Sequence, residues 1–528
     1  MYLLKIKNIM MKNIYNSFLL VGLLFIGFGC TDDFEEMNTS KDSVTEVEPR
    51  FFFTDMVQGV FANYQRNVNL YPDFYAQYWA STGSWAVSDR YDYRDDWIGN
   101  QWKEQYTKFN LESNTIDAQY GDQSAYNDEI AIKNIWMVYW WSRMTDTYGD
   151  IPYFGASNEV ATAYNSQEAI YNDLFVKLDE AIKSIKNDDS QAKYGDYDLI
   201  YSGNTEKWIR FGNSLRLRLA MRISNIDPAK AKTEAQAAIA GGVMISNDDI
   251  AHVPMWSNGN YDYLSQMAWN WDNIRVAKTF TNYLYGQSSV GEDPRAPRWL
   301  SYKVDGKPLT KEEAGKVTYE GLENGLNTNM PSPTEANGRA TIRLENGFVE
   351  FSGDGDENAM YCPVMYYSEV LFLQTEAALR GWTLGDANAL YKQAVKASMD
   401  FVGVNTTDGD AYVNGLGDLS GSNEAQLKQI ITQKWIANFP NGVESWADFR
   451  RTDYPDLTLP VDGVSGNASV VADTYVKRVR YPDNQHDLNE VSMPSQLNTY
   501  ATDRMDVRLW WDVENTKAKS AGLMNSNF

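Results

Sequence analysis

The segment from 130 to 144 limits the possible folds of this chain more than any other part of the sequence. Its pattern is helical, and apolar residues occupy nearly every side of the expected helix. A helix of this kind has no face suited to water and must be buried all round. Gly149 and Pro152 then end it. We therefore expect this helix in the interior of a helical domain.

Amphipathic patterns, with apolar residues at three- and four-residue steps, recur along the rest of the chain. They predict helices over 50–64, 167–185, 205–219, 228–241, 364–378, 385–401 and 427–435. Thr205 is the expected N-cap of the third, and Pro228 occupies the favoured first turn of the fourth. Stretches rich in Gly, Pro, Asn, Ser or Asp are predicted to be irregular, namely 81–97, 252–273, 291–340, 406–421 and 457–472.

Pairs of these helices resemble tetratricopeptide hairpins, as in the motif Ala-Asn-Ala-Leu-Tyr-Lys-Gln-Ala at 387–394. The chain has no strict repeat of about 34 residues, so the repeats would be degenerate. We expect a mainly α fold, in which a tetratricopeptide-like helical hairpin scaffold carries large irregular loop regions.

The N-terminus has the parts of a secretory signal, with three lysines followed by the uncharged apolar segment 18–28. That segment is shorter than the roughly 20 residues needed to span a bilayer. Its end at Gly29-Cys30 resembles a bacterial lipoprotein signal, in which the cysteine is acylated and becomes the first mature residue. Gly27 departs from that pattern, and an ordinary cleaved signal with a free thiol at Cys30 is the alternative.

The expected organisation has three parts. Residues 1–29 form the signal peptide, 30–49 a lipidated flexible tether without helical periodicity, and 50–528 a single helical domain. The start codon is open between Met1, Met10 and Met11.

The charge balance argues against nucleic acid as a partner. The whole chain has 47 basic and 71 acidic residues, and cleavage of the expected signal peptide would remove three of the lysines. A polyanion is held by lysines and arginines that displace its counterions, which this acidic chain supplies poorly. Neutral or cationic ligands fit better.

Cysteine and arginine positions give expectations about the core. Cys30 and Cys362 are the two cysteines, so acylation of Cys30 leaves no disulfide, and the apolar surroundings of Cys362 predict burial. The arginines within or after apolar helices are expected to pair with carboxylates rather than bind ligand. They are Arg143, Arg218, Arg450 and Arg451.

Aromatic residues are abundant, with 17 Trp and 34 Tyr, and they gather in two irregular segments. Sugars present apolar C–H faces ringed by hydroxyls, so a sugar site needs an aromatic platform beside amides and carboxylates. The stacking candidates are Trp85, Tyr91, Tyr93, Trp97, Tyr261, Tyr263, Trp269 and Trp271, and the hydrogen-bonding candidates are Asn100 and Asn270. For each aromatic alone, core packing or a partner contact is the competing interpretation.

Metal and catalytic sites have little support in the sequence. The run 354–358 places oxygen ligands at alternate positions but lacks the rest of a calcium loop. His252 and His486 have no cysteine or second histidine at ligand spacing. No Gly-x-Ser-x-Gly elbow is present, so we expect no enzyme activity. We also expect no metal and no cofactor, with calcium at 354–358 as the open alternative. Two glycosidase carboxylates are not excluded by sequence.

Several segments, in this order, resemble the SusD/RagB-like family of nutrient-binding outer-membrane lipoproteins. They are Trp-Trp-Ser-Arg-Met at 140–144 leading to Tyr-Gly-Asp-Ile-Pro at 148–152, and the segments 208–220, 367–378, 433–437 and 441–452. The resemblance implies a mostly helical fold, a SusC-like TonB-dependent transporter as partner, and a lipid anchor in the outer membrane. The acidic run 32–36 resembles the family's surface-export signal, which implies that the protein faces the cell exterior; a solvated tether is the alternative.

The resemblance does not name the ligand. We expect a cell-surface receptor that captures a glycan or oligosaccharide and delivers it to the transporter. A peptide receptor acting by the same route is one alternative, and a structural protein for envelope assembly is another.

Overall fold

The computed structural model describes residues 47–62, 64–156, 162–188, 190–255, 264, 266–304, 307–327, 335–343, 360–464, 470–471, 473–495, 497–500 and 502–513. Contacts divide the chain into two units, Met1–Glu48 and Pro49–Phe528, and the following description concerns the second. The expected signal peptide, Cys30 and nearly all of the expected tether therefore lie outside the described residues, as do Tyr261, Tyr263 and the run 354–358.

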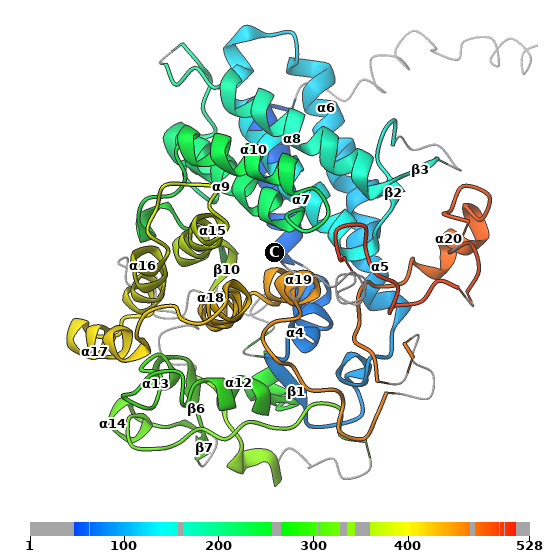
Figure 1. The fold of residues 1–528 in the computed structure, drawn as a ribbon. Coiled ribbons are helices and arrows are strands. Elements are labelled where there is room, and N and C mark those ends of the chain that lie inside the picture. Colours follow the sequence, from blue (N-terminus) through cyan, green and yellow to red (C-terminus); the bar gives the residue numbers. More distant parts are fainter. Residues whose placement is uncertain are drawn as a thin grey trace, which may run out of the picture. The chain divides into compact units, whose positions relative to one another are not determined.

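Two antiparallel helix pairs form one half of the scaffold (Figure 1). The four helices are α7 (Asn127–Tyr148), α8 (Gln167–Ser184), α9 (Thr205–Arg222) and α10 (Pro228–Gly241). Helix α7 packs on α8, α9 packs on α10, and α7 and α8 both contact α9. Almost every residue from 128 to 149, which covers most of α7 and the residue after it, is buried. This confirms the burial predicted from the apolar residues on all sides of the helix.

Short polar side chains fix where these helices begin. Ser166 accepts a hydrogen bond from the Ala169 N–H at the start of α8, and Asn204 accepts one from the Lys207 N–H at the start of α9. The expectation that Thr205 caps α9 is thus wrong by one residue, because the amide oxygen of Asn204 takes that place. Pro228 opens α10 and Gly242 follows its end, as predicted.

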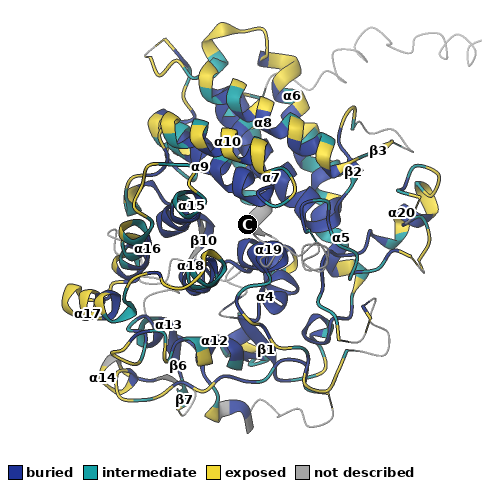
Figure 2. Cartoon of the chain, viewed as in Figure 1, coloured by how far each residue is buried: buried dark blue, intermediate teal, exposed yellow. Residues whose placement is uncertain are grey.

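The second half of the scaffold consists of five helices between residues 367 and 452. They are α15 (Tyr367–Leu379), α16 (Ala387–Phe401), α17 (Thr406–Leu416), α18 (Asn423–Ala437) and α19 (Gly442–Thr452). Helix α15 packs on α16, α18 and α9, so it joins the two halves. Helix α19 is buried along almost its whole length, whereas α17 is largely exposed (Figure 2).

Helix α17 corrects the prediction that 406–421 is irregular. Its many Gly, Asp and Asn residues suggested a loop, but Asn405 caps its first turn by accepting from the Asp408 N–H at 3.0 Å. Tyr412 and Val413 are buried on its inner face, where α17 contacts α16. Packing of two apolar residues and one cap therefore overrides a weak helical composition.

The remaining helices of the described residues are short or lie near the N-terminus. They are α3 (Pro49–Ala62), α4 (Pro72–Tyr75), α5 (Asp95–Glu104), α6 (Asn110–Tyr120), α12 (Lys278–Tyr283), α13 (Ala296–Trp299), α14 (Lys311–Ala314) and α20 (Asp483–Leu488). The predicted helix 50–64 corresponds to α3, and α6 packs on both α3 and α7.

Strands are few and pair only in twos, always antiparallel, in the described part of the chain. They are β1 (Trp79–Ser81) with β5 (Ile274–Val276), β2 (Ile151–Pro152) with β3 (Tyr164–Asn165), β4 (Ala251–Met255) with β10 (Met360–Met365), β6 (Leu300–Ser301) with β9 (Thr341–Ile342), and β7 (Lys303–Val304) with β8 (Lys307–Pro308). The mainly α fold is confirmed. The expectation that 252–273 is wholly irregular is wrong at its start, because β4 pairs with β10, and near its end, where Gln266–Asn270 form a π-helical turn.

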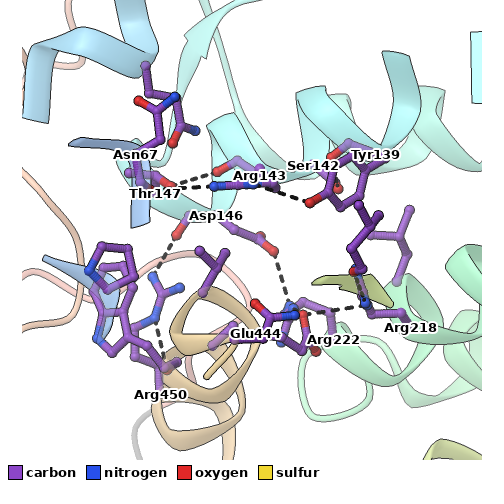
Figure 3. A pocket seen from close by; sticks show the side chains of 18 residues that line it. Asn67, Tyr139, Ser142, Arg143, Asp146, Thr147, Arg218, Arg222, Glu444 and Arg450 are labelled. Carbon is purple, nitrogen blue, oxygen red and sulfur yellow. Dashed lines mark hydrogen bonds and ion pairs between the residues drawn. The ribbon is translucent and has the colours of Figure 1, made fainter. Parts of the chain in front are cut away.

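Buried ion pairs connect the two halves of the scaffold (Figure 3). Arg218 of α9 donates to both oxygens of Glu369 in α15, at 2.7 and 2.8 Å. Arg222, one turn later, bonds Asp146 of α7 at 3.1 Å and Glu444 of α19 at 2.6 Å. The expected pairing of Arg218 is confirmed, and four helices meet through these two guanidinium groups.

A second set of pairs involves the end of α19. Arg451 bonds both oxygens of Glu376 at 2.7 and 2.8 Å, as predicted. Arg143 and Arg450 are buried but form no ion pair within the described part of the chain, which corrects the expectation that they also pair with carboxylates. Cys362 is buried, as predicted.

Breaking the Arg218–Glu369 pair should destabilise the protein strongly. Arg218→Met leaves the Glu369 carboxyl buried without its bidentate partner, so the free energy of unfolding should fall by about 3–5 kcal/mol in urea titrations. The double variant Arg218→Met/Glu369→Leu should recover much of that loss, since no lone charge remains. Equal stability of the single and double variants would contradict this account.

Candidate functional site

The two aromatic segments meet beside the β1–β5 pair. In this pair Trp79 lies opposite Val276 and Ser81 opposite Ile274. Beyond the strands, the Thr82 N–H donates to the Asn273 carbonyl at 3.0 Å. Two segments that are far apart in the sequence therefore form one edge, with aromatic side chains on both sides of it.

Trp85 anchors the first segment to the second. Its indole Nε1 donates to the same Asn273 carbonyl at 3.0 Å, and its ring is half-buried. The ring centre of Trp97 lies 6.1 Å from that of Trp85, at a tilt of 58°. Trp97 belongs to α5 rather than to an irregular excursion, which corrects the loop prediction at that position.

The second segment presents its tryptophans at different depths. Trp269 is half-buried and its Nε1 donates to the Ile342 carbonyl at 3.0 Å. Trp271 is half exposed, at 50% of its surface, which makes it the tryptophan with the largest exposed fraction among the described residues. Asn270 is exposed and its amide donates to Gln266 at 2.7 Å. Trp271 and Asn270 are thus accessible from solvent, whereas Trp269 is held in place by its hydrogen bond to the Ile342 carbonyl.

Charged groups brace this segment through ion pairs. Lys303 lies 5.1 Å above the Trp269 ring and bonds Asp272 at 2.6 Å. Arg275 bonds the same carboxylate at 2.9 Å, and burial lowers the pKa of its guanidinium. Two cations therefore share one carboxylate directly beside Trp271.

A buried carboxyl supports the first segment. Asp89 accepts from the Ser81 N–H at 3.1 Å and from the Asn324 amide at 2.7 Å. Asn324 also donates to the Trp79 carbonyl at 2.7 Å. Burial raises the pKa of Asp89 to about 6, although these hydrogen bonds favour the carboxylate. Sequence reasoning missed both residues, because neither stands out among the polar loop residues of an acidic chain.

Three other predicted site residues, Tyr91, Tyr93 and Asn100, contact different parts of the fold. Tyr91 is 3% exposed and packs on Tyr75 and Tyr475, in the manner of a core residue. Tyr93 lies under the Arg480 guanidinium, 4.1 Å from its ring centre. Asn100 donates to Asn67 at 3.0 Å. These three residues are not brought together with Trp85, Trp269 and Trp271 by any of these contacts.

A separate groove of about 690 Å³ lies between α6, α7 and α8. Its walls carry amides, hydroxyls and both signs of charge, and Trp141 and Tyr153 contribute to the lining. Lys133 is buried there and bonds Asp117 at 2.7 Å. A groove made by three helices leaves no local signal in the sequence, so it was not predicted.

The two histidines have ordinary surroundings. Burial lowers the pKa of His252 to about 4, and His486 lies 2.9 Å from Asp503 while stacking on Tyr500. Within the described ranges, no group of three or more His, Cys, Asp or Glu residues is placed to hold a metal ion. No helix in the same ranges is both long and apolar enough to cross a bilayer.

A family model described as "Starch-binding associating with outer membrane" matches residues 41–482. The chain belongs to this SusD-like family. The family predicted from the segments at 140–152, 208–220 and beyond is thereby confirmed, together with its mainly helical fold.

Three solved structures are similar to most of this chain. A chitin-binding SusD homologue from Flavobacterium johnsoniae is 28% identical, with a TM-score of 0.72 over 88% of this chain and 99% of that one. A SusD homologue from Parabacteroides distasonis is 27% identical, with a TM-score of 0.75 over 88% and 98%. A further chitin-binding protein is 27% identical, with a TM-score of 0.74 over 88% and 100%. No curated protein sequence matches.

The different depths of the tryptophans can be tested by fluorescence quenching. Trp271→Phe should remove a larger part of the acrylamide-quenchable emission than Trp97→Phe, because the Trp97 side chain is 7% exposed and that of Trp271 is 50% exposed. Stern–Volmer plots of both variants give the comparison. Equal losses would show that the 271 side chain is covered in solution.

Proposed function

We propose that this SusD-like protein is a lipid-anchored receptor that binds an oligosaccharide and delivers it to a SusC-like TonB-dependent transporter. The observation that carries the proposal is the β1–β5 pair, which joins the segments of Trp85 and Trp271 at one edge. Trp271 and Asn270 are exposed there, and Trp85 and Trp269 are each held by a hydrogen bond from the indole.

The chemistry of this edge suits a neutral sugar. The C–H face of a pyranose packs on an indole ring, and its hydroxyls bond to amides and carbonyls. Asn270 supplies such an amide, while Asp272 is already shared by Lys303 and Arg275.

The relatives support a glycan as the first ligand to try. The family description names starch, and two relatives at 27% and 28% identity are chitin-binding proteins. Oligomers of both polysaccharides are therefore the first probes. We propose binding without turnover, so the oligomers should be recovered unchanged.

The proposed location follows from the family and the N-terminus. Members associate with the outer membrane by the family's description. Acylation of Cys30 would attach the chain there without a membrane-spanning helix, and the acidic run 32–36 would favour the exterior face. Mass spectrometry of the mature N-terminus tests the lipid, and surface proteolysis of whole cells tests the orientation.

Replacing the exposed tryptophan should weaken glycan binding. In isothermal titration with starch and chitin oligomers, Trp271→Ala should lower the affinity about tenfold or more, since losing one aromatic anchor commonly costs about 2 kcal/mol at the centre of a binding surface. Trp85→Ala should act similarly, because it removes the ring and the bond to Asn273.

Two control variants test whether the ligand binds at the aromatic edge. Trp382→Ala removes a half-buried tryptophan next to Arg380, beyond the end of α15, and should leave the affinity unchanged. Asn134→Ala alters the groove between α6, α7 and α8 and should also have no effect. A loss with Asn134→Ala but not with Trp271→Ala would move the site to the groove, and binding of peptides but no glycan would refute the carbohydrate assignment.

A further inference from the structure

The exposed Trp271 follows directly after a single π-helical turn, Gln266–Asn270. The Trp271 N–H closes this turn by donating to the Gln266 carbonyl at 2.7 Å. Turns with this five-residue hydrogen bond are rare, and they frequently lie at functional sites. The backbone of one turn therefore brings the side chains of Gln266 and Asn270 close to the start of Trp271.

The side chains of Gln266 and Asn270 form an amide pair, in which the Asn270 amide donates to Gln266 Oε1 at 2.7 Å. A primary amide has one carbonyl acceptor and one amino group with two donors. The bond leaves the Asn270 carbonyl and the Gln266 amino group without a partner in the described part of the chain. Exchanging oxygen and nitrogen in both amides again leaves one acceptor and one donor.

Lys303 holds the backbone on both sides of Asn270 and Trp271. Its ammonium donates to the Trp269 carbonyl at 3.0 Å and to the Asp272 carboxylate at 2.6 Å. The two exposed residues therefore lie between two fixed points. A ligand that binds here has less of the turn to order, which favours affinity.

The carboxylate of this turn is already occupied. Asp272 bonds Lys303 at 2.6 Å and Arg275 at 2.9 Å. An ammonium group on a ligand would have to compete with these two cations for one carboxylate, and like charges brought together are unfavourable. The turn thus suits an uncharged ligand group that both donates and accepts hydrogen bonds.

An acetamido group on a sugar has these properties. Its N–H can donate to the free carbonyl of the amide pair, its C=O can accept from the free amino group, and its methyl can pack with the pyranose on the Trp271 ring. A hydroxyl at the same position is smaller and has no methyl group. An ammonium group has no acceptor and meets Lys303.

We propose that the turn formed by Gln266, Asn270 and Trp271 selects glycans that carry acetamido groups. The proposal rests on the glycan-binding function proposed above and names the substituent that this site distinguishes. Gln266 is its new specificity-determining residue, since it is half-buried and holds Asn270 by both ends of the turn's side-chain bond.

The test compares three tetramers by isothermal titration of the whole purified protein in mildly acidic buffer. They are the β-1,4-linked tetramers of N-acetylglucosamine, glucose and glucosamine, which share one linkage and differ in the substituent at carbon 2. The N-acetylglucosamine tetramer should bind about tenfold or more tightly than the glucose tetramer, because it makes one or two further hydrogen bonds. The glucosamine tetramer, with charged amines, should bind most weakly.

Variants assign this preference to the turn. Gln266→Ala and Asn270→Ala should bring the affinity for the N-acetylglucosamine tetramer close to that for the glucose tetramer, and should change the latter by no more than about twofold. Gln119→Ala, which removes an exposed amide of α6, should leave the preference unchanged. Lys303→Met should narrow the gap between the glucosamine and glucose tetramers, since it removes one of the two competing cations.

The comparison on the unaltered protein does not depend on any variant folding. Equal affinity for the three tetramers, or tight binding of starch oligomers with none of the N-acetylglucosamine tetramer, would overturn the selectivity and leave the glycan receptor standing. A preference that survives both Gln266→Ala and Asn270→Ala would also overturn it. Binding of no glycan at all would refute the receptor function itself.

Discussion

The structure depends on two guanidinium groups that lie one helical turn apart. Arg218 and Arg222 of α9 bond carboxylates from α7, α15 and α19, so each half of the scaffold contributes charges that the other half must match. Charges in such a place are stabilising only when their geometry is close to ideal, because desolvation opposes them. The junction therefore fixes the relative orientation of helices whose apolar contacts alone would tolerate small shifts.

The aromatic edge is built on this rigid base. Trp435 of α18 donates to the Ala76 carbonyl at 2.9 Å, and Tyr78 donates to the Trp435 carbonyl at 2.6 Å. Residues 76–78 lead directly into β1, so the strand that aligns the two aromatic segments starts from a buried contact with the scaffold. Trp271 and Asn270, the exposed residues of this edge, lie outside these buried contacts.

Much of the scaffold could be predicted from sequence because its signals are local. The apolar pattern of α7 and the start of α10 at Pro228 depend on residues within a few positions of each other, and the predicted start of α9 was wrong by one residue only. The site could be predicted only by composition. Trp85 and Trp271 were predicted as loop aromatics, but the alignment of their two segments depends on a three-residue ladder that no local pattern encodes. Tyr91 lies in the same aromatic segment as Trp85, yet it packs into the core, since tertiary contacts decide which ring turns outward.

The pairing of the buried arginines, like the position of the aromatic rings, could not be predicted from local sequence. Arg143 and Arg450 look like Arg218 and Arg451 in sequence, each within or near an apolar helix. The carboxylates that distinguish them come from helices elsewhere in the chain, so pairing is a property of the assembled fold.

The β1–β5 ladder also determines when the aromatic edge can exist during folding. Thr82 and Asp272, which bond across it, are 190 residues apart, so the edge cannot form until more than half of the chain has emerged and collapsed. Contacts of such long range form late and contribute little to early intermediates. A partly folded copy would therefore lack this surface, and any function of the aromatic edge would belong to fully folded molecules alone.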